Sequence, residues 1–428
     1  MFFAVLSLLI AVVHLYLWKR LVADTTPPRS RSRRVGTAVL VTFLMLMMAA
    51  LSLGTSVPPD IARWFAWPGY LWLAVFFYLL LTLLVLELPR LVLRRWLRGG
   101  RDEPGESGTS RRRRGAGKRA GHGACVGETS DEPSGGTRLD SPAAANIGSG
   151  TEISRRTALA RGSALVASAV AVGLTGYGVS VAMGPPTVTR VPITLRRLDP
   201  RVEGCRIALI SDVHLGPIIG RSFTQRIVDL VNAERVDAVA IAGDLVDGDV
   251  ADLADAAAPL AKLRSTHGTY YVTGNHEYYS GYRQWIEYLP TLGVRPLRNE
   301  RVEIHHNGGV FDLAGINDAT GYQWQDPGDV EQALAGRDPA RAVVLLAHQP
   351  VDFTQAVDHD VDLLLAGHTH GGQLTPFEVA VQVQQGAVAG LYQRGNTKMY
   401  VTRGAGFWGP PVRVGAPPDI TVVELRRG

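Results

Sequence analysis

Residues 364–373 read LLAGHTHGGQ, so an apolar run ends in a glycine and is followed by two histidines that stand one residue apart. A short apolar run bounded by turn residues is typical of a buried strand. The glycines beside the histidines let the backbone turn sharply and approach other groups closely. Imidazole is a common metal ligand. The stretch therefore predicts a buried strand that delivers His368 and His370 to a metal site.

Similar strands recur through the C-terminal half of the chain, each an apolar run with polar residues directly after it. Strands are predicted at about 206–211, 237–242 and 269–273, and in the stretches VFDLAGIND, ARAVVLLAHQP and VDLLLAGHTHGG. Helical patterns lie between them, at 221–234 and 252–265. Buried strands that alternate with helices predict an α/β architecture with a largely central sheet. Ligand sites in such folds gather at the carboxyl ends of the strands.

Five of the predicted strands are followed by carboxylate, carboxamide or imidazole side chains. These residues are Asp212, His214, Asp244, Asp247, Asn275, His276, Glu277, His348, His368 and His370. Taken singly, each has an ordinary alternative, because an Asp after a strand is often a turn former or a helix cap. Their recurrence at five strand ends favours one shared site.

The types of ligand indicate a hydrolytic metal centre. Carboxylate, imidazole and amide oxygen suit Mn, Fe, Zn or Mg. Cysteine is absent from this set of residues, which argues against a structural zinc site. The ligands are too many for one ion. We therefore expect two divalent cations that share a bridging carboxylate and enclose a hydroxide able to attack phosphorus.

The motifs resemble a known family. D-x-H at 212–214, G-D-x-x-D at 243–247, G-N-H-E at 274–277, the isolated His348 and G-H-T-H at 367–370 look like the full motif set of the calcineurin-like metallophosphoesterases. AHQP, GHTHGGQ and the C-terminal stretch YVTRGAGFWGPPVRVGAPPDITVVEL resemble the bacterial membrane-associated or exported branch. The resemblance covers about residues 200–428 and implies a sandwich of central β-sheets flanked by helices.

The resemblance also implies a role for each motif residue. Two metal sites are expected, with the ligands Asp212, His214 and His370 in one and Asn275, His348 and His368 in the other. Asp244 would bridge the two ions. His276 would lie over the phosphate and either protonate the leaving oxygen or stabilise charge. Asp247 and Glu277 would orient ligands through hydrogen bonds.

The activity implied is hydrolysis of a phosphate ester, and we favour a diester, with Mn, Fe or Zn as the two cations. Asp244 and His276 would be the catalytic residues. A membrane-bound binding or sensing module with little turnover is the alternative, and the intact motif set argues against it. A transporter with a soluble appendage is a weaker alternative, because the apolar segments of the chain hold few polar residues.

Four apolar segments are candidate membrane spans, at 2–18, 37–54, 70–88 and 164–184. Lys and Arg gather in the loops after the first and third segments, which places those loops in the cytoplasm. The N-terminus and the C-terminal domain are then expected outside, in a multi-pass protein of the plasma membrane. His14 and Glu87 lie near span ends, where they can reach the interface.

The chain is expected to have four parts. They are a region of three transmembrane helices at 1–98, a disordered cytoplasmic linker rich in Arg, Gly and Ser at 99–153, a fourth transmembrane or signal-anchor helix at 154–190, and the metallophosphoesterase domain at 195–428. Arg155 and Arg156 resemble a twin-arginine export signal, although they also fit a simple excess of positive charge.

Composition excludes several classes. Much of the net charge of +5 comes from the arginine-rich loops, and basic stretches with interleaved aromatics are lacking in the C-terminal half, so nucleic-acid binding is not expected. Two cysteines, Cys125 and Cys205, exclude a disulfide framework.

The substrate is expected to be an envelope phosphate ester, such as a phospholipid or a wall precursor, with a nucleotide diester as the alternative. Aromatic residues near the motifs are either a lipid-facing mouth or core packing, namely Tyr278, Tyr279, Tyr282, Trp285, Phe407 and Trp408.

Overall fold

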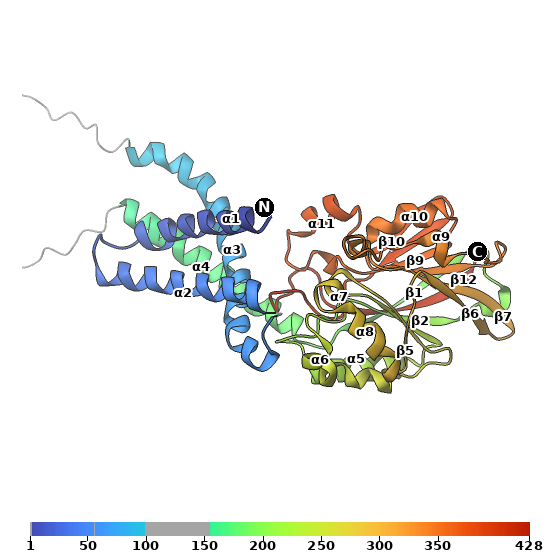
Figure 1. The fold of residues 1–428 in the computed structure, drawn as a ribbon. Helices are drawn as coiled ribbons and strands as arrows, with labels where there is room; N and C mark the ends of the chain where they lie inside the picture. The colour runs from blue at the N-terminus through green and yellow to red at the C-terminus, as the bar shows by residue number, and fades with distance from the viewer. Residues whose placement is uncertain (1, 55, 99–154) are drawn as a thin grey trace, which may run out of the picture.

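The computed structural model describes residues 2–54, 56–98 and 155–428, and it has a bundle of long helices at one end and an α/β domain at the other (Figure 1). The bundle is formed by α1 Phe2–Trp18, α2 Arg31–Leu53, α3 Pro59–Arg98 and α4 Arg155–Ala182. α1 continues as one π-helical turn, Lys19–Ala23. The linker predicted at 99–153 lies outside the described residues.

Three helices within the described residues are long and apolar enough to cross a membrane, namely Arg31–Leu53, Pro59–Val92 and Arg155–Ala182. The first predicted span corresponds to α1, which has only 17 residues. The α-helical part alone rises about 26 Å, close to the roughly 30 Å of a bilayer core, and the π-helical turn after it lengthens the helix. An N-terminal region of apolar helices is therefore confirmed, whereas the count of four spans stays a prediction.

The two ionisable residues of the predicted spans have different surroundings. Glu87 pairs with Arg20 at 2.8 Å, in a group of charges where α1 ends beside α3. His14 does not reach the interface, because it is buried inside the bundle. Its Nδ1 lies 2.9 Å from the Ile10 carbonyl, and its Nε2 accepts a hydrogen bond from Trp72 at 3.1 Å. A fully bonded histidine among packed helices has a structural role here.

Within the described part of the chain, the α/β domain is built on two sheets of six strands each. The first has the order β1-β12-β2-β3-β4-β5, in which the strands are Thr187–Leu195, Asp419–Arg427, Arg206–Ile210, Ala238–Ala242, Thr269–Val272 and Val294–Pro296. The second has the order β10-β11-β9-β8-β7-β6, in which they are Gly390–Arg394, Thr397–Val401, Leu363–Ala366, Val343–Leu346, Gly309–Gly315 and Glu300–His306. The six predicted strands are present and the α/β class is confirmed. The expectation of a largely central sheet from the strand pattern is wrong, because β7, β8 and β9 pair in a sheet of their own. The two sheets agree with the sandwich that the motif resemblance implies.

The two sheets pack face to face because their central strands are apolar on both sides. Ile207 and Leu209 of β2 lie in the layer between the sheets, together with Leu363 of β9. Ala208 and Ile210, the alternate residues of β2, pack against the helices on the outer face. The alternation follows from the two-residue period of a strand, and burial of both faces explains why these strands are continuous apolar runs.

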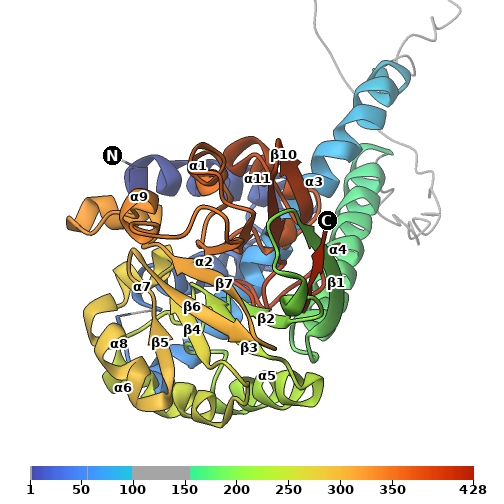
Figure 2. The same cartoon turned by 90° about the vertical axis from the view of Figure 1, so that its right-hand side faces the viewer.

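Short helices cover the outer faces of both sheets. α5 Arg221–Glu234, α6 Val250–Ala257 and α8 Tyr282–Tyr288 lie under the first sheet (Figure 2), and α9 Val330–Ala333 and α10 Phe353–Asp358 pack on the second. α5 has the predicted bounds. The helix predicted at 252–265 changes to a 3₁₀ helix at Ala258–Lys262, because Pro259 has no N–H to continue an α-helix. Further 3₁₀ turns are Pro200–Val202, Leu289–Leu292, Ala319–Trp324, Pro350–Asp352 and His370–Gly372.

The domain meets the bundle through the loop before β12. The backbone N–H of Arg413 in this loop donates to the carbonyl of Gly178 in α4 at 2.9 Å. A Cβ on Gly178 would overlap Val412, so α4 approaches this closely only because it has a glycine there. Two further helices, α7 Asn275–Tyr279 and α11 Glu378–Gln385, lie on the side of the domain that faces the bundle (Figure 1).

Candidate metal centre

The predicted site residues follow strands of both sheets and converge where the carboxyl ends of these strands meet. Asp212 and His214 follow β2, Asp244 and Asp247 follow β3, Asn275, His276 and Glu277 lie in α7 after β4, His348 follows β8, and His368 and His370 follow β9. The site thus combines loops from the first sheet with loops from the second.

Five of these residues have the left-handed backbone that residues other than glycine rarely adopt: φ is 55° at Asp212, 54° at His214, 50° at Asp244, 70° at His368 and 50° at His370. This conformation costs roughly 1–2 kcal/mol per residue. It persists where neighbouring groups hold it, and here the backbone N–H of His214 donates to the Asp244 carbonyl at 3.1 Å. Such a concentration of strain is typical of a functional site.

The first cluster consists of Asp212, His214 and His370, which are all buried. Their potential ligand atoms lie within 4.8 Å of one another. The Nε2 atoms of His214 and His370 are 3.0 Å apart, and Nε2 of His370 is 3.4 Å from Oδ1 of Asp212. The structure therefore brings together the three residues expected at one metal site.

The second cluster consists of Asp244, His348 and His368, again with ligand atoms within 4.8 Å of one another. Nε2 of His348 lies 3.1 Å from Oδ2 of Asp244 and 3.2 Å from Nδ1 of His368. Oδ1 of Asn275 is 3.2 Å from the same Nε2. Oδ2 of Asp244 is also 3.8 Å from Nε2 of His214, so Asp244 stands between the two clusters.

The two clusters fit divalent cations. Ring nitrogens of different histidines face each other at 3.0 Å and 3.2 Å, and each such pair can share only one proton. Buried carboxylates lie among them, and burial of unpaired charge is costly. Cations placed between these nitrogens and oxygens would satisfy both sets of lone pairs.

The electrostatics favour the metal-binding protonation state at Asp244, His368 and His370. In contrast, burial raises the pKa of Asp212, and the charge of Asp244 raises the pKa of His348 well above its usual value despite burial. Burial disfavours the charge of Asp244, but the charges of His348 and His276 hold the pKa of its carboxyl well below the usual range. Burial, with the charge of His348, lowers the pKa of His368 to about 3. Burial also lowers the pKa of His370 well below its usual value. Carboxylate and neutral imidazole are the forms that coordinate a cation.

Glu277 holds the loop that carries Asp244. Its carboxylate accepts hydrogen bonds from the backbone N–H groups of Gly274 at 2.6 Å, Asp244 at 3.0 Å and Leu245 at 2.6 Å. Burial and the charge of Asp244 raise the pKa of Glu277 to about 7. This side chain therefore positions a candidate ligand, and it belongs to neither cluster.

Replacement of Glu277 by glutamine should destabilise the domain, because an amide offers one acceptor oxygen and turns N–H groups toward backbone donors. We expect the free energy of unfolding to fall by about 3 kcal/mol and the unfolding midpoint to fall by roughly 10 °C. Tryptophan fluorescence during heating of the metal-free, full-length protein measures this. Glu287→Gln, on the exposed side of α8, is the matched control. An equal midpoint for the two variants would contradict the role of Glu277.

Asp247 and His276 lie beside the two clusters. Oδ1 of Asp247 accepts hydrogen bonds from Nδ1 of His214 at 2.9 Å and from Nδ1 of His276 at 2.7 Å. The backbone N–H of His276 donates to Oδ1 of Asp244 at 2.9 Å. Burial opposes the charged form of His276, yet Asp244 and Asp247 raise its pKa to about 9. His276 therefore carries a proton at neutral pH, as an acid or a charge stabiliser requires.

Arg413 is a site residue that the sequence did not indicate. Its guanidinium is buried, and it donates to the His370 carbonyl at 2.6 Å and lies 3.0 Å from Nδ1 of the same histidine. Burial lowers the pKa of Arg413 to about 10. Asp318 was also missed; it follows β7 and accepts hydrogen bonds from Gln349 at 2.9 Å and 3.1 Å. The sequence did offer a signal for Asp318, because it ends the predicted strand stretch VFDLAGIND. Arg413 lies in a loop rich in glycine and proline, where no comparable pattern marks it.

One further group of potential ligands in the described residues lies away from the centre. Cys205, Asp237 and His306 meet at the opposite ends of β2 and β3, next to the end of β6. Burial and the charge of Asp237 raise the pKa of Cys205 to about 12, so its thiol stays protonated at neutral pH. The two clusters at the strand carboxyl ends are therefore the candidate metal centre.

The chain is similar to known proteins. The family model for the calcineurin-like phosphoesterases matches residues 205–372. An uncharacterized metallophosphoesterase of Helicobacter pylori is 40% identical over 260 residues, which are 59% of this chain and 68% of that protein. The chain belongs to the calcineurin-like metallophosphoesterase family. The resemblance seen in the sequence is thus confirmed, and a metal-dependent phosphohydrolase domain follows from it.

Two further relatives are a protein whose name calls it transmembrane and a metallophosphoesterase of a second bacterium. A bovine protein named "transmembrane protein with metallophosphoesterase domain" is 40% identical over 266 residues, which are 59% of this chain and 60% of its own length. The uncharacterized metallophosphoesterase YkuE of Bacillus subtilis is 30% identical over 274 residues, which are 61% of this chain and 94% of its own length. The bovine name and the apolar helices of this chain support membrane association of this metallophosphoesterase.

Proposed function

We propose that the protein is a membrane-anchored phosphodiesterase that works with two divalent cations. The observation that carries this proposal is the position of Asp244, whose Oδ2 lies 3.1 Å from His348 and 3.8 Å from His214. A carboxylate between two sets of ligands is what a pair of cations requires as a bridge. Asp212, His214 and His370 would hold one cation, and Asn275, His348 and His368 would hold the other.

Divalent cations held at these positions would supply positive charge to a phosphate ester and would lower the pKa of water toward about 7. The ligand set suits Mn, Fe or Zn. The protein's own residues do the rest. Asp247 binds Nδ1 of His276, which leaves Nε2 of that ring to donate a proton or a hydrogen bond to an ester oxygen. Asp247 also binds Nδ1 of His214, which leaves Nε2 of His214 directed at the cluster.

Hydrolysis of bis-p-nitrophenyl phosphate by the full-length protein in detergent tests the proposal. The metal-free protein is reloaded with Mn²⁺, Fe²⁺ or Zn²⁺, bound metal is counted, and p-nitrophenyl phosphate is assayed in parallel. We expect turnover to return with two bound ions and to be faster on the diester. Two bound ions without turnover would contradict the proposal and favour a binding or sensing module. Faster turnover of the monoester would make the protein a phosphomonoesterase.

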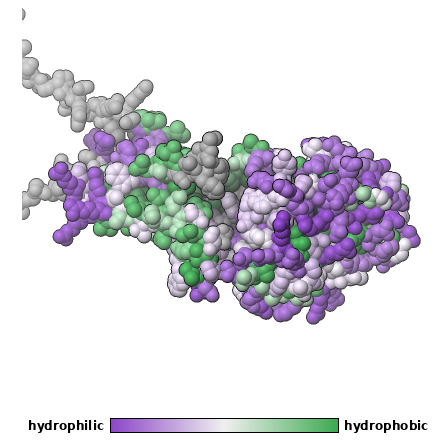
Figure 3. All heavy atoms as spheres, in the orientation of Figure 1, coloured by the Kyte–Doolittle hydropathy of each residue, from purple (hydrophilic) through white to green (hydrophobic). Residues whose placement is uncertain are grey.

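We also propose that the catalytic domain lies outside the cytoplasm. The start of α1, the connection from α2 to α3 and the catalytic domain are at one end of the bundle (Figure 1). The opposite end carries hydrophilic residues (Figure 3), including the arginines at the start of α2 and of α4. Because cytoplasmic ends carry an excess of Lys and Arg, that end is expected inside.

A reporter fusion tests this orientation. Alkaline phosphatase folds to its active form only outside the cytoplasm, so a fusion at the C-terminus should be active. A fusion made after Arg98, at the opposite end of α3, should be inactive and serves as the control. The reverse result would place the catalytic domain in the cytoplasm.

A further inference from the structure

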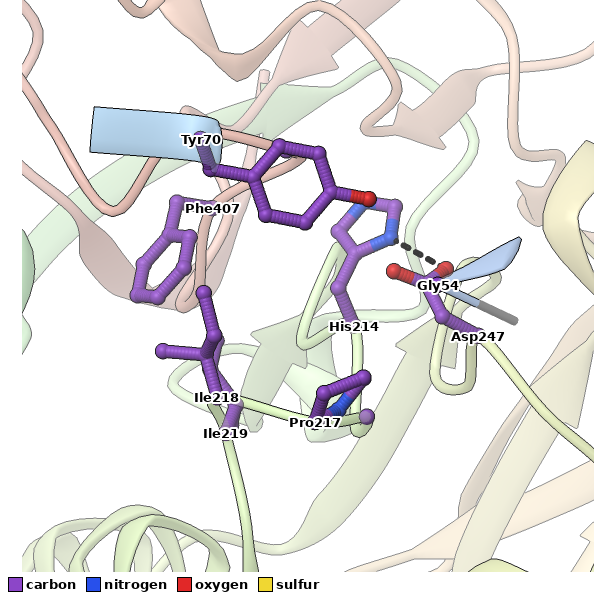
Figure 4. Close-up of a pocket in the computed structure, with 10 residues that line it drawn as sticks. Gly54, Tyr70, His214, Pro217, Ile218, Ile219, Asp247 and Phe407 are labelled. Atoms are coloured by element: carbon purple, nitrogen blue, oxygen red, sulfur yellow. Dashed lines mark hydrogen bonds and ion pairs between the residues drawn. The ribbon is translucent and has the colours of Figure 1, made fainter. Parts of the chain in front are cut away.

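The metal centre lies directly beside the helices of the bundle. A cavity is lined on one side by Gly54, where α2 ends, and Tyr70 of α3, and on the other by His214, Asp247 and Phe407 of the domain (Figure 4). The side chain of Tyr70 stays at this position because its hydroxyl donates to the Ala50 carbonyl of α2 at 3.1 Å. Two side chains of the candidate centre therefore face apolar helices across one small cavity.

An unpartnered apolar face lies at the same edge of the domain, on α11. Val379 is 65% exposed and Val383 is 83% exposed, and residues four apart share one side of a helix. Phe377, directly before the helix, is 46% exposed, whereas Val381 on the other side is buried. Figure 3 shows apolar atoms over α11, beside the apolar surface of the bundle. A helix with one apolar and one polar face suits the interfacial region of a membrane.

Two exposed aromatic rings flank His276. The ring centroids of Tyr279 and Trp408 are 6.0 Å and 6.2 Å from that of His276, and these residues are 60% and 52% exposed. Tyr278 and Trp285, by contrast, are buried in the domain. The aromatic residues near the motifs thus divide into core residues and two rings at the mouth of the centre. Tyr and Trp are enriched where protein meets the membrane–water interface.

We infer that the enzyme takes its substrate from the bilayer: a phosphate ester whose lipid tail stays in the membrane while its phosphate reaches the metal centre. This inference rests on the proposed phosphodiesterase function. The bilayer is the occupant of the exposed face of α11, because that face and the aromatic mouth lie on the side of the domain that carries the apolar helices. An apolar entrance that faces the apolar helices would not help an enzyme to bind a water-soluble ester.

The reaction on such a lipid is ordinary hydrolysis. Water adds its oxygen to phosphorus, one P–O ester bond breaks, and the departing alkoxide takes a proton. With phosphatidylglycerol, the products are phosphatidate and glycerol if the outer ester breaks, or diacylglycerol and glycerol phosphate if the inner ester breaks. Product analysis therefore shows which oxygen leaves.

The test compares lipid and soluble substrates of the same reconstituted, full-length enzyme. The lipid probes are the diester phosphatidylglycerol and, to detect a monoesterase, the monoesters phosphatidate and a polyprenyl phosphate, each a minor component of phosphatidylcholine vesicles. The soluble probes are the short-chain analogue of phosphatidylglycerol and bis-p-nitrophenyl phosphate. We expect at least one lipid to be hydrolysed, and its rate to fall when it is diluted within the membrane at constant bulk concentration. The short-chain analogue should react at least about tenfold more slowly.

Variants of α11 separate membrane contact from chemistry. Val379→Ser with Val383→Ser should lower turnover in vesicles about tenfold, from the loss of buried apolar area, and leave hydrolysis of bis-p-nitrophenyl phosphate unchanged. Gln382→Ser with Gln384→Ser, on exposed polar positions of the same helix, is the control and should change neither rate.

The outcomes distinguish the two proposals. One outcome is that the enzyme hydrolyses the soluble diester, while no lipid is hydrolysed and no lipid slows that reaction. This outcome would overturn the bilayer inference and leave the proposed phosphodiesterase function intact. Equal vesicle rates for the valine variant and the glutamine control would also count against it. If the enzyme holds two metal ions but hydrolyses neither the soluble diester nor any lipid, the proposed function itself is contradicted.

Discussion

Asp244→Asn should abolish hydrolysis of bis-p-nitrophenyl phosphate and reduce the bound metal below two ions per chain. Asparagine has the same size, but it removes the negative charge that lies between Nε2 of His348 and Nε2 of His214. The repulsion between two nearby cations is offset by the attraction of each to a carboxylate that lies between them. We expect turnover to fall at least about a thousandfold, which corresponds to roughly 4 kcal/mol of transition-state stabilisation.

Metal analysis and kinetics on the same preparation measure this effect. Asp229→Asn makes the same chemical change on the exposed side of α5, and it should keep both the metal and the activity. An Asp244→Asn protein that retained two ions and its turnover would show that Asp244 does not bridge. A protein that lost turnover and kept both ions would assign Asp244 a role in the chemistry alone.

His276→Ala should leave the bound metal intact and lower kcat by about 10²–10⁴-fold. His276 lies beside the clusters and reaches them through Asp247 and its own backbone N–H, so its ring is not needed to hold a cation. The loss should be larger for an alkyl leaving group than for nitrophenolate, because a poor leaving group depends more on a proton. His276→Gln, which can donate a hydrogen bond but not a proton, separates the two roles.

Equal losses for both leaving groups, with rescue by glutamine, would make His276 a charge stabiliser and not an acid. His305→Ala is the matched control, since His305 is exposed on β6 and should leave kinetics and metal content unchanged. Loss of metal in His276→Ala would contradict its assignment outside the ligand set. The metal content of His276→Ala thus distinguishes a role of His276 in the chemistry from a role in holding the metal ions.

Most residues of the candidate centre were predictable, because short patterns of neighbouring residues mark them in the sequence. Each motif follows directly on an apolar run, as Asp212 follows β2 and His368 follows β9. Parallel strands of one sheet carry whatever follows them to the same edge, so the sequence placed these residues at strand ends, and the stacking of the two sheets brought the two sets together. The metal roles of the residues stay predictions, while the family and the α/β class are confirmed.

Other features were beyond the sequence because they depend on contacts between distant segments. The pairing of β1 with β12 joins residues near both ends of the domain, and an apolar strand does not specify its partner. Arg413 bears no motif, and it becomes part of the centre only because its loop folds back over His370. His14 looked like an interfacial residue until the packing of α3 placed Trp72 against it.

The sequence by itself determined the strands, the ligand residues that follow them and the presence of apolar helices, because each is a pattern of neighbouring residues. The tertiary structure decided which strands form each of the two stacked sheets, since sheet pairing depends on which apolar faces bury each other. It also decided that Tyr70 of α3 faces His214 and Asp247 across a small cavity. That position follows from the close packing of α4 on the loop before β12, which sets the catalytic edge of the domain against the helices.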